Sequence, residues 1–186
     1  MSPDEPLVRC GWAGTAPEYV AYHDDEWGRV LQDDREMFER LSLEAFQSGL
    51  SWITILRKRE AFRSAFAGFD IATVAAFTEA DVRRLMTDST IVRNRAKIEA
   101  TVANARAAVD LGESLSDLVW SFAPEPEPPP RSFTDVPATT PESTALAKTL
   151  RRHGFRFLGP TTAYALMQAT GMVNDHVADC WVRSQP

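Results

Sequence analysis

The sequence contains no long run of apolar residues. No stretch approaches the ~18 consecutive apolar residues of a membrane span, so we expect no membrane partner. The first ten residues include Asp4 and Glu5 and lack a basic flank followed by an apolar core, which is unlike a secretory signal. These absences predict a cytoplasmic protein.

Cysteine and histidine are also rare. The 186 residues include two cysteines and three histidines, too few for a disulfide framework. In the cytosol, two cysteines fit free thiols or metal ligands better than a disulfide. A chain of this length, with 44% hydrophobic residues, can bury a core of its own, so we predict one domain over residues 1–186.

An excess of positive charge is missing as well. The net charge is −6, which by itself argues against nucleic acid, whose phosphates favour basic partners. However, no acid lies between Glu142 and Asp175, so one face could be basic on an acidic molecule. Solvated helix charges explain the same pattern, and charge alone favours that explanation. The basic residues of the interval are Lys148, Arg151, Arg152 and Arg156.

What the chain does contain is helical periodicity along most of its length. Thr78 followed by Asp81 resembles a capping arrangement, and Gly112 is the expected C-cap of a long helix. No internal repeat and no convincing strand pair is evident, so the predicted fold class is all-α. The predicted helices are Asp34–Phe46, Trp52–Phe66 after Ser51 as N-cap, a segment following Thr78, Arg95–Leu111, Ser114–Phe122, Pro141–Arg152, Thr161–Thr170 and Val173–Val182.

One segment is rich in proline. Five of the seven residues in Pro124–Pro130 are proline, which excludes a helix or a central strand there. Together with its flanks, at about 123–139, this segment is predicted to be an extended surface connection between two helical halves.

The cysteines and two of the histidines lie near the chain ends. Cys10 and His23 come early, whereas His176 and Cys180 come late with the spacing H-x3-C. If the late segment is helical, residues i and i+4 share a face and can point at one ion. Two thiolates and two imidazoles suit a closed, tetrahedral zinc site that would join the two ends. Spacing alone, however, favours two unrelated buried cysteines and ordinary histidines.

Two further features could bind a ligand. In Gly154–Tyr164 a Gly-Pro turn precedes a helix, whose free N–H groups could hold a DNA phosphate, although a plain helix–helix turn is an equally good explanation. Glu44 has apolar neighbours, and a buried carboxylate beside aromatic rings would suit a flat cationic ligand. Alternatively, the aromatic residues belong to the core and Glu44 lies on the surface or bonds a helix end. The aromatic residues concerned are Trp12, Tyr19, Tyr22, Trp27 and Trp52.

An ordered set of motifs resembles 3-methyladenine DNA glycosylase I, the Tag type. No single motif is decisive, but the set runs in family order over nearly the whole chain and is therefore highly specific. The matching segments are Arg9–Trp12, Tyr22–Gly28, Leu43–Thr54, Ile91–Ile98, Val119–Phe122, Gly154–Gly159, Met167–Ala169 and Gly171–Val177.

This resemblance implies an all-helical fold of the helix-hairpin-helix glycosylase superfamily. It implies a monofunctional base excision repair enzyme that flips 3-methyladenine out of damaged double-stranded DNA and hydrolyses its glycosidic bond. We expect a monomer with no nucleotide cofactor. The resemblance also implies a structural zinc held by Cys10, His23, His176 and Cys180.

The resemblance also assigns roles to individual residues. Glu44 would recognise the methylated base and serve as the catalytic carboxylate, with Tyr22 and Trp52 stacking on the base and Trp12 and Tyr19 as lesser pocket members. Leu50, in the turn at Gly49, would fill the gap left by the flipped nucleotide. The hairpin residues that would hold the DNA backbone are Gly159, Pro160 and Thr161.

One departure from the wider superfamily concerns catalysis. Many members carry Val-Asp-x-His-Val after the hairpin, and here Asn174 takes the place of that Asp. A base methylated at N3 is already cationic and leaves without protonation, so binding and strain matter more than general acid catalysis. No superfamily lysine precedes Thr161, so we expect no Schiff base. Two alternatives remain, a DNA clamp that has lost its chemistry and a structural zinc protein.

Overall fold

A computed structural model describes residues 7–184, and within that range the chain folds into ten α-helices and four short 3-10 helices without a β-strand. The all-α prediction is therefore confirmed. In chain order the elements are η1 (Gly11–Ala13), α1 (Pro17–Asp25), α2 (Asp34–Gln47), α3 (Trp52–Leu56), α4 (Arg59–Ala65), η2 (Ala67–Phe69), α5 (Ile71–Ala75), α6 (Glu79–Thr87), α7 (Arg95–Asp110), α8 (Leu115–Trp120), η3 (Phe133–Asp135), α9 (Pro141–Arg152), α10 (Pro160–Ala169) and η4 (Trp181–Ser184).

Local capping explains where several helices begin and end. The Thr78–Asp81 capping box forms at the start of α6, as predicted. Asn94 caps α7 by accepting a hydrogen bond from the Lys97 backbone, and Gly112, just beyond this helix, takes the left-handed φ of 73°. Pro160 is the first residue of α10, a position at which its missing N–H costs nothing.

The predicted helix Trp52–Phe66 is two helices. The backbone at Lys58 leaves the helical region with φ −102° and ψ 0°, and this break separates α3 from α4. The Lys58 amide bonds to Ile55 O in a tight turn, while its ammonium donates to Thr90 O at 2.8 Å. A distant carbonyl therefore supports a break that the apolar periodicity does not reveal.

The prediction of a helix over Val173–Val182 was wrong, because turns and the short η4 occupy this segment. Its backbone N–H groups find partners outside any helical ladder. His176 N donates to the Asn174 side chain, Val177 N to the Cys10 sulfur and Ala178 N to Pro130 O. Tertiary contacts therefore replace the i to i−4 bonds that a helix would need.

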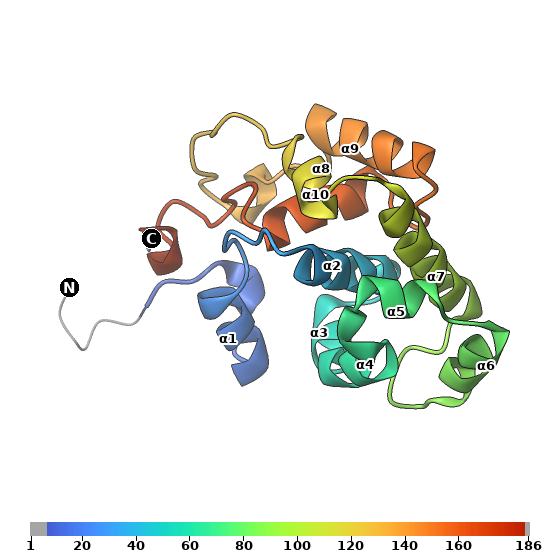
Figure 1. Ribbon diagram of the computed structural model, residues 1–186. Helices are drawn as coiled ribbons and strands as arrows, with labels where there is room; N and C mark the ends of the chain where they lie inside the picture. The colour runs from blue at the N-terminus through green and yellow to red at the C-terminus, as the bar shows by residue number, and fades with distance from the viewer. Residues whose placement is uncertain (1–6, 185–186) are drawn as a thin grey trace.

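The helix α2 runs through the centre of the molecule (Figure 1). Every residue from 37 to 46 is buried, because α7, α8 and α10 contact this helix together with α3 and η2. The first and last described segments lie beside each other next to α1 (Figure 1). Because neighbouring helices enclose α2, the side chains of residues 37–46, polar or not, are withdrawn from bulk water.

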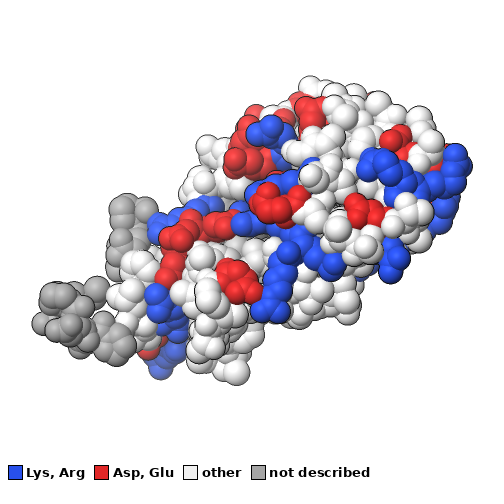
Figure 2. All heavy atoms as spheres, turned by 90° about the horizontal axis from the view of Figure 1, so that it is seen from below, with Lys and Arg blue, Asp and Glu red and all other residues white. Residues whose placement is uncertain are grey.

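The proline-rich connection joins α8 to α9. Residues 123–131 form no helix or strand, as predicted, but η3 follows at Phe133–Asp135. No helix in residues 7–184 is long and apolar enough to cross a membrane. On the face shown in Figure 2, Lys and Arg side chains lie beside Asp and Glu, with a basic cluster at the end away from the termini.

Candidate metal centre and base-binding site

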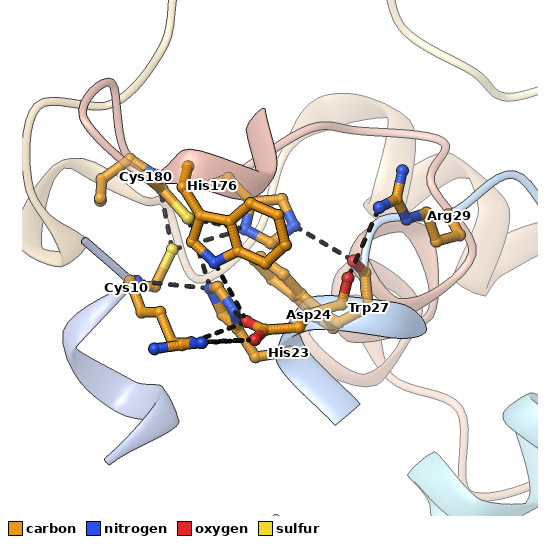
Figure 3. Close-up of polar contacts among 10 residues, drawn as sticks. Cys10, His23, Asp24, Trp27, Arg29, His176 and Cys180 are labelled. Carbon is orange, nitrogen blue, oxygen red and sulfur yellow. Dashed lines mark hydrogen bonds and ion pairs between the residues drawn. The ribbon is translucent and has the colours of Figure 1, made fainter. Parts of the chain in front are cut away.

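Four potential metal ligands converge from the two chain ends (Figure 3). Cys10, His23, His176 and Cys180 are all buried, and their ligand atoms lie within 4.8 Å of one another. The Cys10 sulfur is 3.6 Å from His176 Nδ1, and the Cys180 sulfur is 3.5 Å from both His176 Nδ1 and His23 Nε2. The convergence was expected, although the helix proposed to produce it does not form.

The spacing of these atoms suits a tetrahedral metal ion. Zinc bonds of about 2.1 to 2.3 Å place tetrahedral ligands about 3.5 Å apart, close to the distances found here. The other ring nitrogens are held as well: His23 Nδ1 lies 2.8 Å from Asp24 Oδ1, and His176 Nε2 lies 3.1 Å from Trp27 O. Such outer contacts fix the ring orientations of metal-binding histidines. These four residues could hold one metal ion.

The protonation chemistry of the cluster is consistent with this use. Burial lowers the pKa of His176 to about 4, which keeps the imidazole in the neutral form that binds metals. Burial raises the pKa of the Cys10 thiol to about 12, so a thiolate there needs a neighbouring cation. Gly28 must stay small, since an added Cβ would lie 3.1 Å from His176 Nε2.

A cavity of about 640 Å³ lies between α1, α2, α3, α10 and the connection around η3. Its walls combine aromatic rings with one carboxylate, from Glu44. The sequence offered two interpretations of the aromatic residues, and the structure places all five on this cavity. They are Trp12, Tyr19, Tyr22, Trp27 and Trp52.

Glu44 has the most unusual environment in this cavity. The residue is only 5% exposed, and within residues 7–184 its carboxylate has no hydrogen-bond or ion-pair partner. Burial raises the pKa of Glu44 to about 8, opposed in part by the guanidinium of Arg40 one helical turn earlier. A buried acceptor without a donor is costly, so this carboxylate is suited to a ligand that supplies a donor and positive charge.

Two of the aromatic rings contact each other directly. The ring centroids of Tyr22 and Trp52 are 5.3 Å apart with 46° between the planes, too close for a flat base to enter between them. The surfaces open to a flat ligand are instead the ring faces that turn to the cavity. Trp12 packs on Tyr19 and Trp27 at 5.3 Å and 4.9 Å and closes the wall from the α1 side.

The turn after α2 displays Leu50 at the edge of the cavity. Gly49 lines the cavity with a φ of 80°, and Leu50, which is 41% exposed, follows it. From behind, Lys97 Nζ donates to the carbonyls of Phe46 and Ser48 at 2.8 and 2.6 Å. This buried lysine of α7 therefore holds the turn in place.

The hairpin between α9 and α10 borders the same cavity. Gly159 precedes the helix, Pro160 is its first residue, and Thr161 lines the cavity. The loop is fixed by Asn104, whose side chain accepts from Arg156 N at 2.7 Å and donates to Arg156 O at 3.1 Å. The start of α10 is thereby aimed at the mouth of the cavity.

Residues 12–184 of this chain match the family described as methyladenine glycosylase. The chain belongs to the methyladenine glycosylase family. It is 47% identical over 179 residues to DNA-3-methyladenine glycosylase 1 of Escherichia coli strain K12, covering 94% of this chain and 96% of that protein.

Solved structures agree with this assignment. A crystal structure of 3-methyladenine DNA glycosylase I (TAG) superposes with a TM-score of 0.91 at 47% identity, covering 94% of this chain and 98% of the other. The Staphylococcus aureus 3-methyladenine DNA glycosylase I, solved to explain 3-methyladenine recognition, gives a TM-score of 0.90 at 35% identity, with 98% and 100% covered.

Some residues at the site of this methyladenine glycosylase family member were not predicted. Lys97 was noted only as part of a matching motif, and Tyr164 and Gln168 line the cavity without having been singled out. Asn174, which was compared above with an acid of the wider superfamily, is exposed and does not line this cavity. The last turn of α2 contains no basic residue, so the carbonyls at this helix end need a donor from elsewhere in the chain. That need is the sequence signal that could have revealed Lys97.

Proposed function

We propose that this chain is a monofunctional DNA-3-methyladenine glycosylase that flips the damaged nucleotide from double-stranded DNA and hydrolyses its N-glycosyl bond. Its family and the names of its relatives support this activity. The observation that carries the proposal is the buried, unpartnered carboxylate of Glu44 in a cavity walled by aromatic rings. A flat cationic base satisfies this site through charge pairing, hydrogen bonding and stacking.

Methylation at N3 explains why this site selects its substrate. The methylated adenine carries positive charge while it is still attached to the sugar, so the ionised form of Glu44 is favoured when it binds. The Glu44 carboxylate accepts a hydrogen bond from the base, and Tyr22 and Trp52 stack on it. Trp12 and Tyr19 complete the aromatic wall.

The same charge removes the need for a strong acid catalyst. When the C1′–N9 bond breaks, its electron pair moves into the ring and the base leaves as neutral 3-methyladenine. Water adds to C1′ and one proton passes to solvent. No lysine lines the cavity as far as the structure is described, which is consistent with hydrolysis without a Schiff base or strand cleavage.

DNA is held by elements around the mouth of the cavity. Leu50, displayed by the turn at Gly49, fills the space left in the duplex by the flipped nucleotide. Gly159, Pro160 and Thr161 form the hairpin of a helix-hairpin-helix motif, and backbone N–H groups at the start of α10 bind a phosphate. This grip is independent of sequence, as repair of scattered lesions requires.

The cluster of two cysteines and two histidines holds a structural zinc. When bound, zinc neutralises the thiolates and cross-links the two ends of the chain, and a site closed by four protein ligands has no position for substrate. Zinc therefore stabilises the fold and takes no part in hydrolysis. We further propose that the enzyme is a cytoplasmic monomer built as a single domain.

Chromatography of bases released from methylated duplex DNA tests the proposed function. The purified protein is expected to release 3-methyladenine and to leave 7-methylguanine in the DNA. Release of both bases would contradict the narrow specificity assigned to Glu44 and its aromatic neighbours. Binding to the DNA without any release, by folded protein, would instead identify the chain as a DNA clamp.

A further inference from the structure

A hydrogen-bonded group of side chains lies on the wall of the base cavity that α10 forms. Tyr164 and Gln168, both on α10, line the cavity, and both donate to the same Asp175 oxygen. The distances are 2.7 Å from the Tyr164 hydroxyl and 2.8 Å from Gln168 Nε2. Burial and the Asp175 carboxylate raise the pKa of Tyr164, so its phenol stays protonated as a donor.

The Asp175 carboxylate determines the orientation of the Gln168 amide. One Asp175 oxygen accepts from both the Tyr164 hydroxyl and Gln168 Nε2, so the Gln168 amide presents its NH2 group to Asp175. The Gln168 Oε1 atom is then left as an acceptor, and no donor to it is found in residues 7–184. Gln168 is half-buried on the cavity wall, where this oxygen is accessible to water.

We infer that Gln168 positions the water that attacks the sugar, and that Asp175 acts as a positioning residue by fixing the Gln168 amide. This inference rests on the proposed function, which needs a water at C1′ but names no group to hold it. An amide oxygen can orient a water without taking its proton, and enzymes use glutamine in this way.

The hydrolysis needs no protein side chain as a general base. The water donates one O–H to Gln168 Oε1 and directs a lone pair at C1′. The C1′–O bond forms, the C1′–N9 bond breaks, and the departing pair neutralises the methylated base. The protonated hydroxyl that results releases one proton to solvent, so no oxidant, reductant or further reactant is required.

Gln168→Met tests this role while keeping side-chain volume. We expect the single-turnover rate of 3-methyladenine release to fall about 100-fold, as misplacement of one reactant can cost. The affinities for free 3-methyladenine and for a duplex with a stable abasic analogue are expected to stay within twofold, because the Gln168 oxygen is assigned to the water and not to the base or the DNA backbone. Gln32→Ala removes an exposed glutamine as a matched control and is expected to leave all three values unchanged.

Asp175 gives a second, independent test. Asp175→Ala frees the Gln168 amide to rotate and is expected to lower the rate about tenfold or more, in the same direction as Gln168→Met. Asp175→Asn keeps an oxygen that accepts from Gln168 and is expected to restore most of the rate. A purely structural role would instead lower thermal stability and free-base affinity together with the rate.

The outcomes separate this inference from the proposed function. A wild-type rate for Gln168→Met in folded protein would overturn the assignment of the water to Gln168. An equal loss of rate and of free-base affinity would also overturn it, since Gln168 would then shape the base site only. Failure of the wild-type protein to release 3-methyladenine would contradict the proposed function itself.

Discussion

At the residue scale, the molecule maintains an ionisable group in an environment that disfavours its charge. Glu44 is enclosed because the whole turn of α2 around it is buried, and it has no described partner to repay the lost hydration. The free protein therefore holds this carboxyl mainly in its neutral form near pH 7, and a cationic base is what would ionise it. Burial of this carboxyl destabilises the free protein, and the proposed binding of a cationic base offsets that loss of free energy.

This environment makes stability depend on pH. Between about pH 4.5 and pH 8 the unfolded chain has Glu44 ionised while the folded chain keeps it protonated, so the folded state binds more protons. The free energy of unfolding of the wild type is therefore expected to fall, relative to Glu44→Gln, as pH rises through this interval. Urea unfolding of both proteins at pH 5, 6.5 and 8 measures the difference. A difference that does not change with pH would contradict the burial of an unpartnered carboxyl.

At the element scale, the contact between α7 and the end of α2 supports the candidate DNA-contacting turn. The last turn of α2 contains no basic residue, and Lys97 supplies the missing donor from a helix about fifty residues away. Its ammonium satisfies two carbonyls at the C-terminal end of the helix, where no further turn of helix supplies N–H donors. Leu50 is thereby held at the rim of the cavity by a contact that is not local in sequence.

Removal of this contact is expected to loosen the turn. Lys97→Met leaves the carbonyls of Phe46 and Ser48 without a charged donor, and we expect a loss of about 2 kcal/mol in the free energy of unfolding. Urea unfolding measures this loss, with Lys148→Met, at an exposed position on α9, as the matched control. Stability equal to that of the control would show that the two hydrogen bonds contribute little.

Individual helices and loops also show which parts of the fold can be predicted from the sequence. The starts of α6 and α7 were predictable because their caps lie within three residues, and the interior of α2 because its periodicity is local. The structure of the segment after Val173 was not predictable, since its backbone N–H groups donate to Cys10, Asn174 and Pro130. The aromatic residues and Glu44 were identified as candidates, but their meeting in one cavity, and the bond between Gln168 and Asp175, depend on how separate elements pack.

At the scale of the whole molecule, the two ends of the chain form one structural unit. The cluster joins two pairs of residues, Cys10 with His23 and His176 with Cys180, that lie more than 150 positions apart in sequence, as in the 3.6 Å contact of Cys10 with His176. Trp12 and Tyr22 lie within a few residues of these ligands and also line the base cavity. The proposed zinc would therefore hold one wall of the cavity in place from a distance.

Metal analysis and chelation test this arrangement. The purified protein is expected to contain about one zinc per chain, as a single four-ligand site requires. Chelation, or the substitution Cys180→Ser, is expected to lower the thermal unfolding midpoint, because binding free energy is lost from the folded state. Metal-free protein whose two thiols titrate freely and whose midpoint is unaffected by chelator would exclude a structural zinc.

The central claim, that Glu44 recognises a cationic methylated base, is tested most directly by Glu44→Gln. The measurement compares 3-methyladenine release from methylated duplex DNA, and affinity for that DNA, in the variant and the wild type. Loss of one charge-assisted hydrogen bond predicts release about 10- to 100-fold slower, with DNA affinity nearly unchanged because the hairpin and Leu50 are intact. Release at the wild-type rate by the variant would contradict the role assigned to Glu44.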